Sequence, residues 1–330
     1  MKSLSALFLA LFVALLLSPA QAQFWKSKPK EVDKHAAETK AATEGAIKMP
    51  AGVDLERARL LDQARKTKVY AEMVGIGDAS NEKLLFPPAV AKAVGVTTRQ
   101  MQRRFSDTLA RSRRFEIFDA SSTVTAEATD IVIDGMVTGT TQELVPIEGG
   151  VRVSMTRVRL SLQMKDRYTG KQLFPAAVEV VGQTGRSTGD RVVLSPQERE
   201  DDPAVQRRLA VDYERAMQRA FDEAARRIHT VLRPLARVLA VEDDQINLLG
   251  GSTHGLQGGD ELVIFRSVTT RVGDVEVIAS SRALMVVRCE GVGTLTSQCQ
   301  IIRKDPKHGP PKEGDYAVLS DVSSSGVREE

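Results

Sequence analysis

The sequence is poor in aromatic residues and in cysteine. Aromatic residues make up 5% of the 330 residues and Trp25 is the single tryptophan, which argues against a protein that binds sugars or bases by ring stacking. The two cysteines, Cys289 and Cys299, are fewer than the three or four protein ligands of a zinc site. In an oxidising compartment we expect them to pair, which would stabilise the fold by about 2–3 kcal/mol. Two free buried thiols are the alternative.

Recognisable catalytic motifs are missing as well. The sequence contains no GxSxG, HExxH, CxxC or Walker pattern, the spacings at which nucleophiles, zinc ligands, thiol pairs and phosphate loops occur. Its four histidines, His35, His229, His254 and His308, are scattered along the chain, and we expect His229 on the surface of a helix. We therefore predict no enzyme, no catalytic residue, no metal site, no cofactor and no small-molecule substrate.

Charge of one sign is not in large excess. The formal net charge is +3 although 27% of the residues are charged, so the overall balance does not call for a nucleic-acid partner. One stretch is locally basic, because Arg99, Arg103, Arg104 and Arg111 surround the lone Asp107 along a predicted helix. We predict that these arginines form a docking patch for an acidic protein surface or an anionic envelope polymer. A solvated helix face is the alternative.

The first residues have the pattern of a secretory signal peptide. A short positive start is followed by the apolar run 4–17 and by small residues that place a cleavage site between Ala22 and Gln23. A buried N-terminal helix is the alternative. No cysteine follows the apolar run, so we expect an exported protein of the periplasm that is not a lipoprotein and that associates peripherally with the outer membrane.

The remaining chain divides by its hydrophobic periodicity. Apolar residues at helical spacing predict a helix from Thr97 or Thr98 to about Arg113 and a longer one from Pro203 to about Pro234. The strands that we expect are Val69–Gly75, Phe115–Phe118, Asp130–Thr138, Val151–Met164 and Leu173–Val181, followed by a set of short strands after Pro234. The domains are a signal peptide at 1–22, a flexible tether at 23–53, an α/β domain at 54–233, a small β-barrel at 234–320 and a disordered tail at 321–330.

Two local patterns carry finer predictions. The alternation of apolar residues in 151–164 changes phase midway, which predicts a β-bulge near Thr156 and Arg157. The glycine-rich stretch 250–262 is followed by a strand pattern and lacks the lysine of a phosphate loop. We therefore expect it to be a turn between two strands, with His254 as a turn residue. Asp243 and Asp244 are expected in a hairpin turn.

Short motifs occur in a characteristic order along 69–232. They are RRFEIFD (113–119), ATDIVIDGMVTG (128–139) and DRYTGKQLF (166–174), followed by the long helix. In this order they resemble the curli-transport CsgG family and its relatives with a TolB-amino-terminal-type α/β domain. The residues that carry the resemblance most clearly are Phe115, Gly135, Asp166, Thr169 and Gly170.

A second resemblance involves about 80 residues at the C-terminal end. Its residues are Gly251, Gly255, Leu256, Gly259, Asp260, Leu262 and Val263. Their spacing resembles that of the C-terminal SH3-like barrel of the flagellar H-ring assembly family. Together the two resemblances imply an α+β protein: a mixed α/β sandwich domain of TolB-amino-terminal type, followed by a small all-β SH3-like barrel.

The resemblances imply a role in envelope assembly. We expect a non-enzymatic scaffold that contacts envelope proteins at the outer membrane and can form a homo-oligomeric ring, for a secretion or surface-organelle apparatus. Two alternatives stay open: a subunit of a CsgG-like secretion channel, and a regulator of cell-wall synthesis similar to penicillin-binding-protein activators. The channel is disfavoured because 140–150 looks too short and polar for a membrane hairpin and 182–200 is rich in charge.

Overall fold

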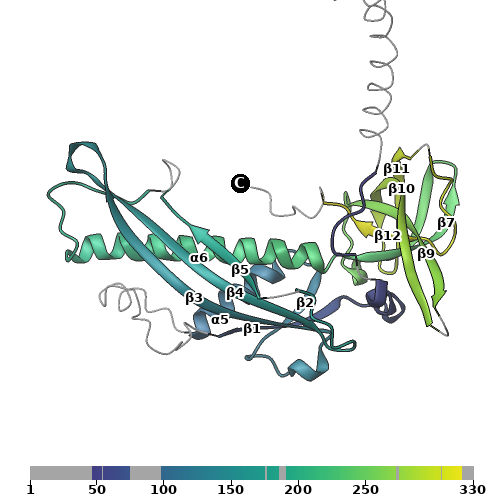
Figure 1. Ribbon diagram of the computed structural model, residues 1–330, viewed down its shortest axis with the longest axis horizontal. Coiled ribbons are helices and arrows are strands. Elements are labelled where there is room, and N and C mark those ends of the chain that lie inside the picture. Colours follow the sequence, from purple (N-terminus) through teal and green to yellow (C-terminus); the bar gives the residue numbers. More distant parts are fainter. Residues whose placement is uncertain are drawn as a thin grey trace, which may run out of the picture. The chain divides into compact units, whose positions relative to one another are not determined.

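Figure 1 shows the computed structural model, which describes residues 47–53, 55–74, 98–174, 177–185, 191–272, 275–305 and 307–321. The predicted signal peptide with its cleavage point at Ala22 and Gln23, residues 23–46 of the predicted tether and residues 322–330 of the predicted tail lie outside the described residues. Residues Met49–Glu330 form one compact unit. Within the described part of the chain, no helix has the length and apolar character needed to cross a membrane.

A six-stranded mixed sheet forms the first half of this unit. Its order is β2-β1-β3-β4-β5, with the short β6 paired to β4. β1 runs parallel to β2 and β3, and β4 runs antiparallel to β3 and β5. The strands are β1 (Thr67–Val74), β2 (Phe115–Phe118), β3 (Ile131–Pro146), β4 (Arg152–Asp166), β5 (Val178–Gln183) and β6 (Val193–Leu194). The predicted strands are thus confirmed, although β5 begins later than expected.

Two helices cover one face of the sheet. α5 (Thr98–Ala110) and α6 (Pro203–Val231) bury their apolar stripes in one core with β1, β3, β4 and β5, and Phe105 of α5 meets Phe221 of α6 at 5.5 Å between ring centroids. The Asp202 side chain caps α6 by accepting a hydrogen bond from the Ala204 N–H at 2.7 Å. Both predicted helices are confirmed. The 3-10 helix η1 (Leu55–Gln63) precedes β1.

The contact between β5 and α6 requires a glycine. A Cβ on Gly182 would lie 1.9 Å from the Ala216 carbonyl oxygen and 2.4 Å from the Ala220 nitrogen, both in the backbone of α6. Because no side chain fits at these distances, the backbone of the helix packs directly against the strand at this position.

The predicted bulge at Thr156 and Arg157 is wrong. In β4 every second residue from Ser154 onward is buried or nearly so, without a change of phase, and the register shift lies in β3 between Val137 and Gly139. The apparent phase change arises because two inward positions of β4 are polar. Ser154 Oγ and Thr156 Oγ1 donate hydrogen bonds of 2.6 and 2.7 Å to Oδ2 of Asp212, a fully buried residue of α6.

Residues 140–150 also differ from expectation. β3 continues to Pro146 and pairs with β4 up to Arg152, so the hairpin strands are 16 and 15 residues long. A turn containing Gly149 at φ +75° and Gly150 at φ +72° joins them. The β-hairpin formed by β3 and β4 is therefore longer than predicted. Its outer end is polar, as predicted, because Glu143 is exposed and Arg152 pairs with Glu200.

A closed six-stranded barrel follows α6. The strand order is β10-β11-β8-β7-β12-β9, which confirms the small all-β barrel and the α+β class. The predicted turn at Asp243 and Asp244 is present, with Asp243 at φ +46°. The strands are β7 (Leu235–Glu242), β8 (Gln245–Leu249), β9 (Glu261–Val272), β10 (Val275–Val292), β11 (Thr296–Lys304) and β12 (Tyr316–Leu319).

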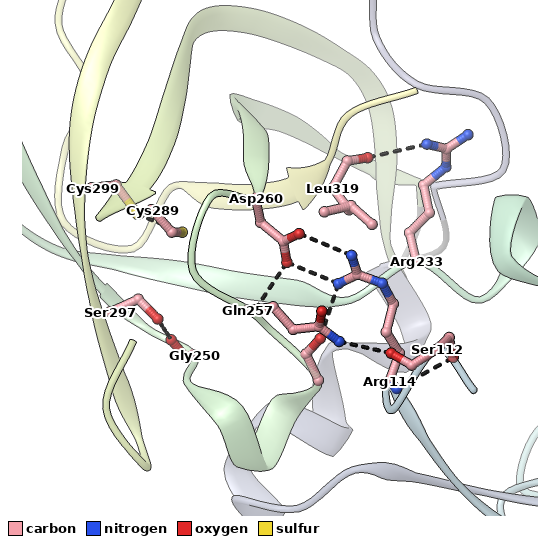
Figure 2. A network of polar contacts seen from close by, with 11 residues as sticks. Ser112, Arg114, Arg233, Gly250, Gln257, Asp260, Cys289, Ser297, Cys299 and Leu319 are labelled. Carbon is pink, nitrogen blue, oxygen red and sulfur yellow. Dashed lines mark hydrogen bonds and ion pairs between the residues drawn. The ribbon is translucent and has the colours of Figure 1, made fainter. Parts of the chain in front are cut away.

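The glycine-rich stretch is a turn between β8 and β9, as predicted, and it also holds the barrel against the sheet. Figure 2 shows Arg114, at the start of β2, pointing at Asp260: its guanidinium donates two hydrogen bonds of 2.8 Å to the carboxylate. Arg114 also donates to the Gly255 carbonyl at 3.1 Å, and Gln257 donates to the Ser112 carbonyl at 2.7 Å. Arg114 and Asp260 thus form a buried ion pair joined by two hydrogen bonds.

Candidate docking surface

The predicted docking patch lies on α5 and faces carboxylates of α6. Arg104 is 3.4 Å from Glu214 and Arg111 is 3.7 Å from Asp222. Arg103 is 85% exposed and lies 4.0 Å from Asp107 on its own helix. The side chain of Arg99 lies outside the described residues. Two of the four arginines thus have carboxylate partners on the neighbouring helix, and their role in docking stays a prediction.

A second basic surface lies on the outer side of α6, and the sequence interpretation did not single it out. It is a groove of about 380 Å³ between α6 and the segment leading into β6. Four arginines and three valines line it, and we call it the arginine groove. Its residues are Arg191, Val192, Val193, Arg207, Arg208, Val211 and Arg215.

The spacing on α6 explains why these side chains share one surface. Arg207, Val211 and Arg215 follow each other at intervals of four residues, Arg208 precedes Val211 by three, and the buried stripe begins with Val205. A basic face opposite an apolar stripe was therefore the signal available in the sequence. The segment 191–193 arrives from β5, far from these residues in sequence, so only the fold completes the groove.

Among the residues that the structure describes, no carboxylate lines the arginine groove. Arg208 pairs with Glu198 and also donates to the Val193 carbonyl at 3.1 Å. The pKa of Glu198 is lowered, first by the backbone N–H of Ser195 and then by Arg208. Within the described part of the chain, Arg207 donates one hydrogen bond, to the Pro203 carbonyl of its own helix at 3.2 Å. A carbonyl oxygen does not neutralise a guanidinium, so the groove keeps a net positive charge.

The groove also exposes apolar surface. Val193 is 46% exposed and Val211 is 48% exposed. Beneath them a small apolar cluster of Val192, Leu194, Val205 and Leu209 is buried and packs against Leu144 of β3. Two exposed valines between guanidinium groups, resting on a packed base, form a surface that can bind an acidic and aliphatic partner.

A larger cavity of about 700 Å³ opens at the carboxyl ends of the parallel strands β1 and β2. Burial alone would raise the pKa of Asp119 there, but hydrogen bonds from Ser121, Ser106 and Gln102 outweigh burial and lower it. Among the residues that the structure describes, the cavity lining includes no histidine, cysteine or lysine, and no group of three metal-ligating side chains occurs. Its lining is Glu72, Met73, Gln102, Arg103, Asp107, Asp119, Ala120 and Ser121.

The expected surface position of His229 is wrong. The residue is 7% exposed, and its ring stacks on Phe115 with centroids 4.9 Å apart. Burial, aided by the positive charge of Arg114, lowers the pKa of His229 to about 4. The buried face of α6 is thus wider than the spacing of its aliphatic residues alone indicated.

His254 is a buried turn residue. Its Nδ1 accepts a hydrogen bond from the Gly251 N–H at 3.1 Å, so Nε2 carries the proton and donates to the Leu61 carbonyl at 3.1 Å. Both ring nitrogens are used by the backbone, and the side chain is not available as a catalytic base.

Cys289 and Cys299 face each other on β10 and β11. The backbone N–H and C=O of Cys289 bond to residues 260 and 259, so the cysteines form a non-hydrogen-bonded pair, the type with the shorter Cα separation of about 4.5 Å. That separation suits a disulfide. No disulfide joins the two cysteines in the structure, and their Sγ atoms lie 2.8 Å apart. The pKa of Cys299 is raised by its contact with Cys289 and by burial. Pairing stays a prediction.

Comparison with known proteins does not assign a family. No protein-family model and no curated protein matches the sequence. Among solved structures, a hypothetical protein from Chlamydia trachomatis is 12% identical over 50% of this chain and 98% of its own, with a TM-score of 0.33. A lipoprotein from Neisseria meningitidis is 13% identical over 37% of this chain and 88% of its own, with a TM-score of 0.23. The PelC dodecamer from Paraburkholderia phytofirmans is 11% identical over 47% and 89%, with a TM-score of 0.20. Likeness at this level carries no functional argument.

Proposed function

We propose that this chain is a non-enzymatic assembly protein of the bacterial envelope that acts through protein–protein contacts. The observation that carries the proposal is the arginine groove, whose described lining combines a net positive charge with two exposed valines beside a packed apolar cluster. The signal-peptide pattern of residues 1–22 supports export to the periplasm. A partner with an acidic and aliphatic surface fits the groove.

The finer fold assignment belongs to the same proposal. We assign the sheet with α5 and α6 to the TolB-amino-terminal type, and the barrel to the SH3-like type. One motif behind the resemblance makes a compact turn: Asp166 Oδ1 accepts hydrogen bonds from the N–H groups of Tyr168 and Thr169 at 2.9 and 3.0 Å, and Gly170 at φ +69° completes the turn. These contacts support the motif as a structural unit.

Cell fractionation tests the function. Cells producing the native protein and the double variant Arg207→Glu/Arg215→Glu would be fractionated, and the membrane pellet would be washed with high salt and then with detergent. We expect the native protein in the periplasm or released by salt, because a surface electrostatic contact is screened at high ionic strength. We expect the variant to lose its membrane-associated fraction.

A matched variant controls for net charge. Arg157→Glu/Arg167→Glu makes the same charge change at exposed positions outside the groove, and it should fractionate like the native protein. Release of the native protein by detergent alone would contradict the peripheral scaffold and favour the secretion-channel alternative. Equal behaviour of both variants would remove the groove from the proposal.

A further inference from the structure

The barrel presents a surface whose chemistry is the opposite of the arginine groove. At the turn between β7 and β8, Glu242, Asp243 and Asp244 are all exposed. Asp244 pairs with Lys304 at 3.1 Å, while neither Glu242 nor Asp243 forms an ion pair within the described residues. We call residues 239–244 the acidic hairpin.

Exposed aliphatic side chains accompany these carboxylates. Leu239 is 39% exposed and Val241 is 38% exposed. The acidic hairpin thus combines net negative charge with exposed aliphatic surface, and the described lining of the arginine groove combines net positive charge with Val193 and Val211. The two surfaces are complementary in charge and in apolar character.

A single chain cannot bring these two surfaces together. Arg215, the last groove residue on α6, lies 16 residues before Val231 at the end of the helix, which is about 24 Å at 1.5 Å per residue. The barrel follows the C-terminal end of α6 (Figure 1), and the groove residues of α6 lie in its N-terminal half. The acidic hairpin of one chain therefore lies beyond the reach of its own groove.

We propose that the arginine groove binds the acidic hairpin of a second copy of this chain. The inference deepens the proposed function, on which it rests, by naming the partner as the protein itself. The contact joins two different surfaces, so it generates either a two-fold pair with two such contacts or a head-to-tail row of copies.

Charge exchange between the two surfaces gives a direct test. The groove variant Arg207→Glu/Arg215→Glu places two acidic side chains beside the remaining Arg191 and Arg208. The hairpin variant Glu242→Lys/Asp243→Lys places two basic side chains beside Asp244. Each variant alone should therefore lose the charge attraction between its own copies. An equimolar mixture restores opposite charges at every contact.

Analytical ultracentrifugation of the purified mature protein provides the measurement. We expect the native protein to associate reversibly, and less so as the salt is raised from about 0.1 M to about 1 M, where the screening length falls from about 10 Å to about 3 Å. Each variant alone should associate at least about tenfold more weakly. The mixture should recover association, which also shows that both variants are folded. Arg157→Glu/Arg167→Glu should behave like the native protein.

A second measurement places the contact. One chain carries Val211→Cys and another carries Glu242→Cys, and oxidation of the mixture should yield a dimer of one chain of each kind. Oxidation of either variant alone should yield far less dimer.

Three results would overturn the inference. They are a native protein that stays monomeric at every concentration and salt, a mixture that associates no better than its components, and oxidation that crosslinks all combinations equally.

If the purified protein stays monomeric but binds vesicles of phosphatidylglycerol and phosphatidylethanolamine through the groove, the occupant is a membrane surface. If it stays monomeric and groove-dependent fractionation persists in cells, the second copy is excluded while the proposed function stands. If both tests are negative, both proposals fail.

Discussion

The buried ion pair between Arg114 and Asp260 offers a sharp test of how the barrel is held against the sheet. Their side chains are 8% and 7% exposed, and two hydrogen bonds of 2.8 Å join them. Replacing Arg114 by alanine leaves the Asp260 carboxylate buried without its countercharge. It also removes the donor to the Gly255 carbonyl. Breaking a buried pair from one side costs about 3–5 kcal/mol, so we expect Arg114→Ala to lower the free energy of unfolding by about that amount.

Urea denaturation followed by circular dichroism measures this loss. Asp260→Ala breaks the pair from the other side. The double variant Arg114→Met/Asp260→Leu removes both charges, so no buried charge remains unpaired, and its loss of stability should be clearly smaller than the sum of the losses of Arg114→Ala and Asp260→Ala. Arg103→Ala is the surface control, and it should change stability by no more than about 0.5 kcal/mol. A loss below about 1 kcal/mol for Arg114→Ala, or strict additivity of the two single changes, would refute the structural role of the pair.

Three further predictions concern packing, pH and redox state. Gly182→Ala should destabilise by about 3 kcal/mol because the added carbon meets the backbone of α6; Gly258→Ala, where nothing lies within 4 Å, should leave the melting temperature nearly unchanged, and equal melting temperatures would refute the packing argument. His229 has a folded pKa of about 4 against about 6.5 in the unfolded chain. Below pH 6.5 the unfolded state therefore binds more protons, and stability should fall by up to about 3 kcal/mol as pH drops through that window; a denaturation series that matches that of His229→Phe at each pH would contradict this. Cys289 and Cys299 should be paired in protein isolated from the periplasm, and alkylation of both thiols without a reductant would disprove the pairing.

Much of the architecture follows from local pattern. The stripe of α6 predicts a helix that begins at Pro203, because steps of three and four place its apolar residues on one face. The strands β1 and β2 and the turn at Asp243 follow from alternation and turn chemistry in the same way. The closed barrel follows from short strands punctuated by glycine and aspartate, although β11 was not foreseen and β10 is one continuous strand of 18 residues.

The errors have a common physical origin. Ser154 and Thr156 look like outward residues because they are polar, yet they point inward to Asp212 on α6. His229 looks like a surface residue because imidazole is polar, yet it stacks on Phe115. In each case a distant segment supplies the contact that buries the polar side chain, a carboxylate for Ser154 and Thr156 and an aromatic ring for His229, and no local period reveals such a contact.

The sequence by itself determined the helices, most of the strands and the turn character of the glycine-rich stretch, because hydrophobic periodicity and backbone preference act over a few residues. Only the tertiary structure decided which charges remain free. Arg104 and Arg111 face Glu214 and Asp222, and Arg114 is buried against Asp260. Among the described residues, the partner of Arg207 is a backbone carbonyl. These arginines are alike in sequence, and their difference depends on carboxylates brought near by the fold, since electrostatic pairing acts through space and not along the chain.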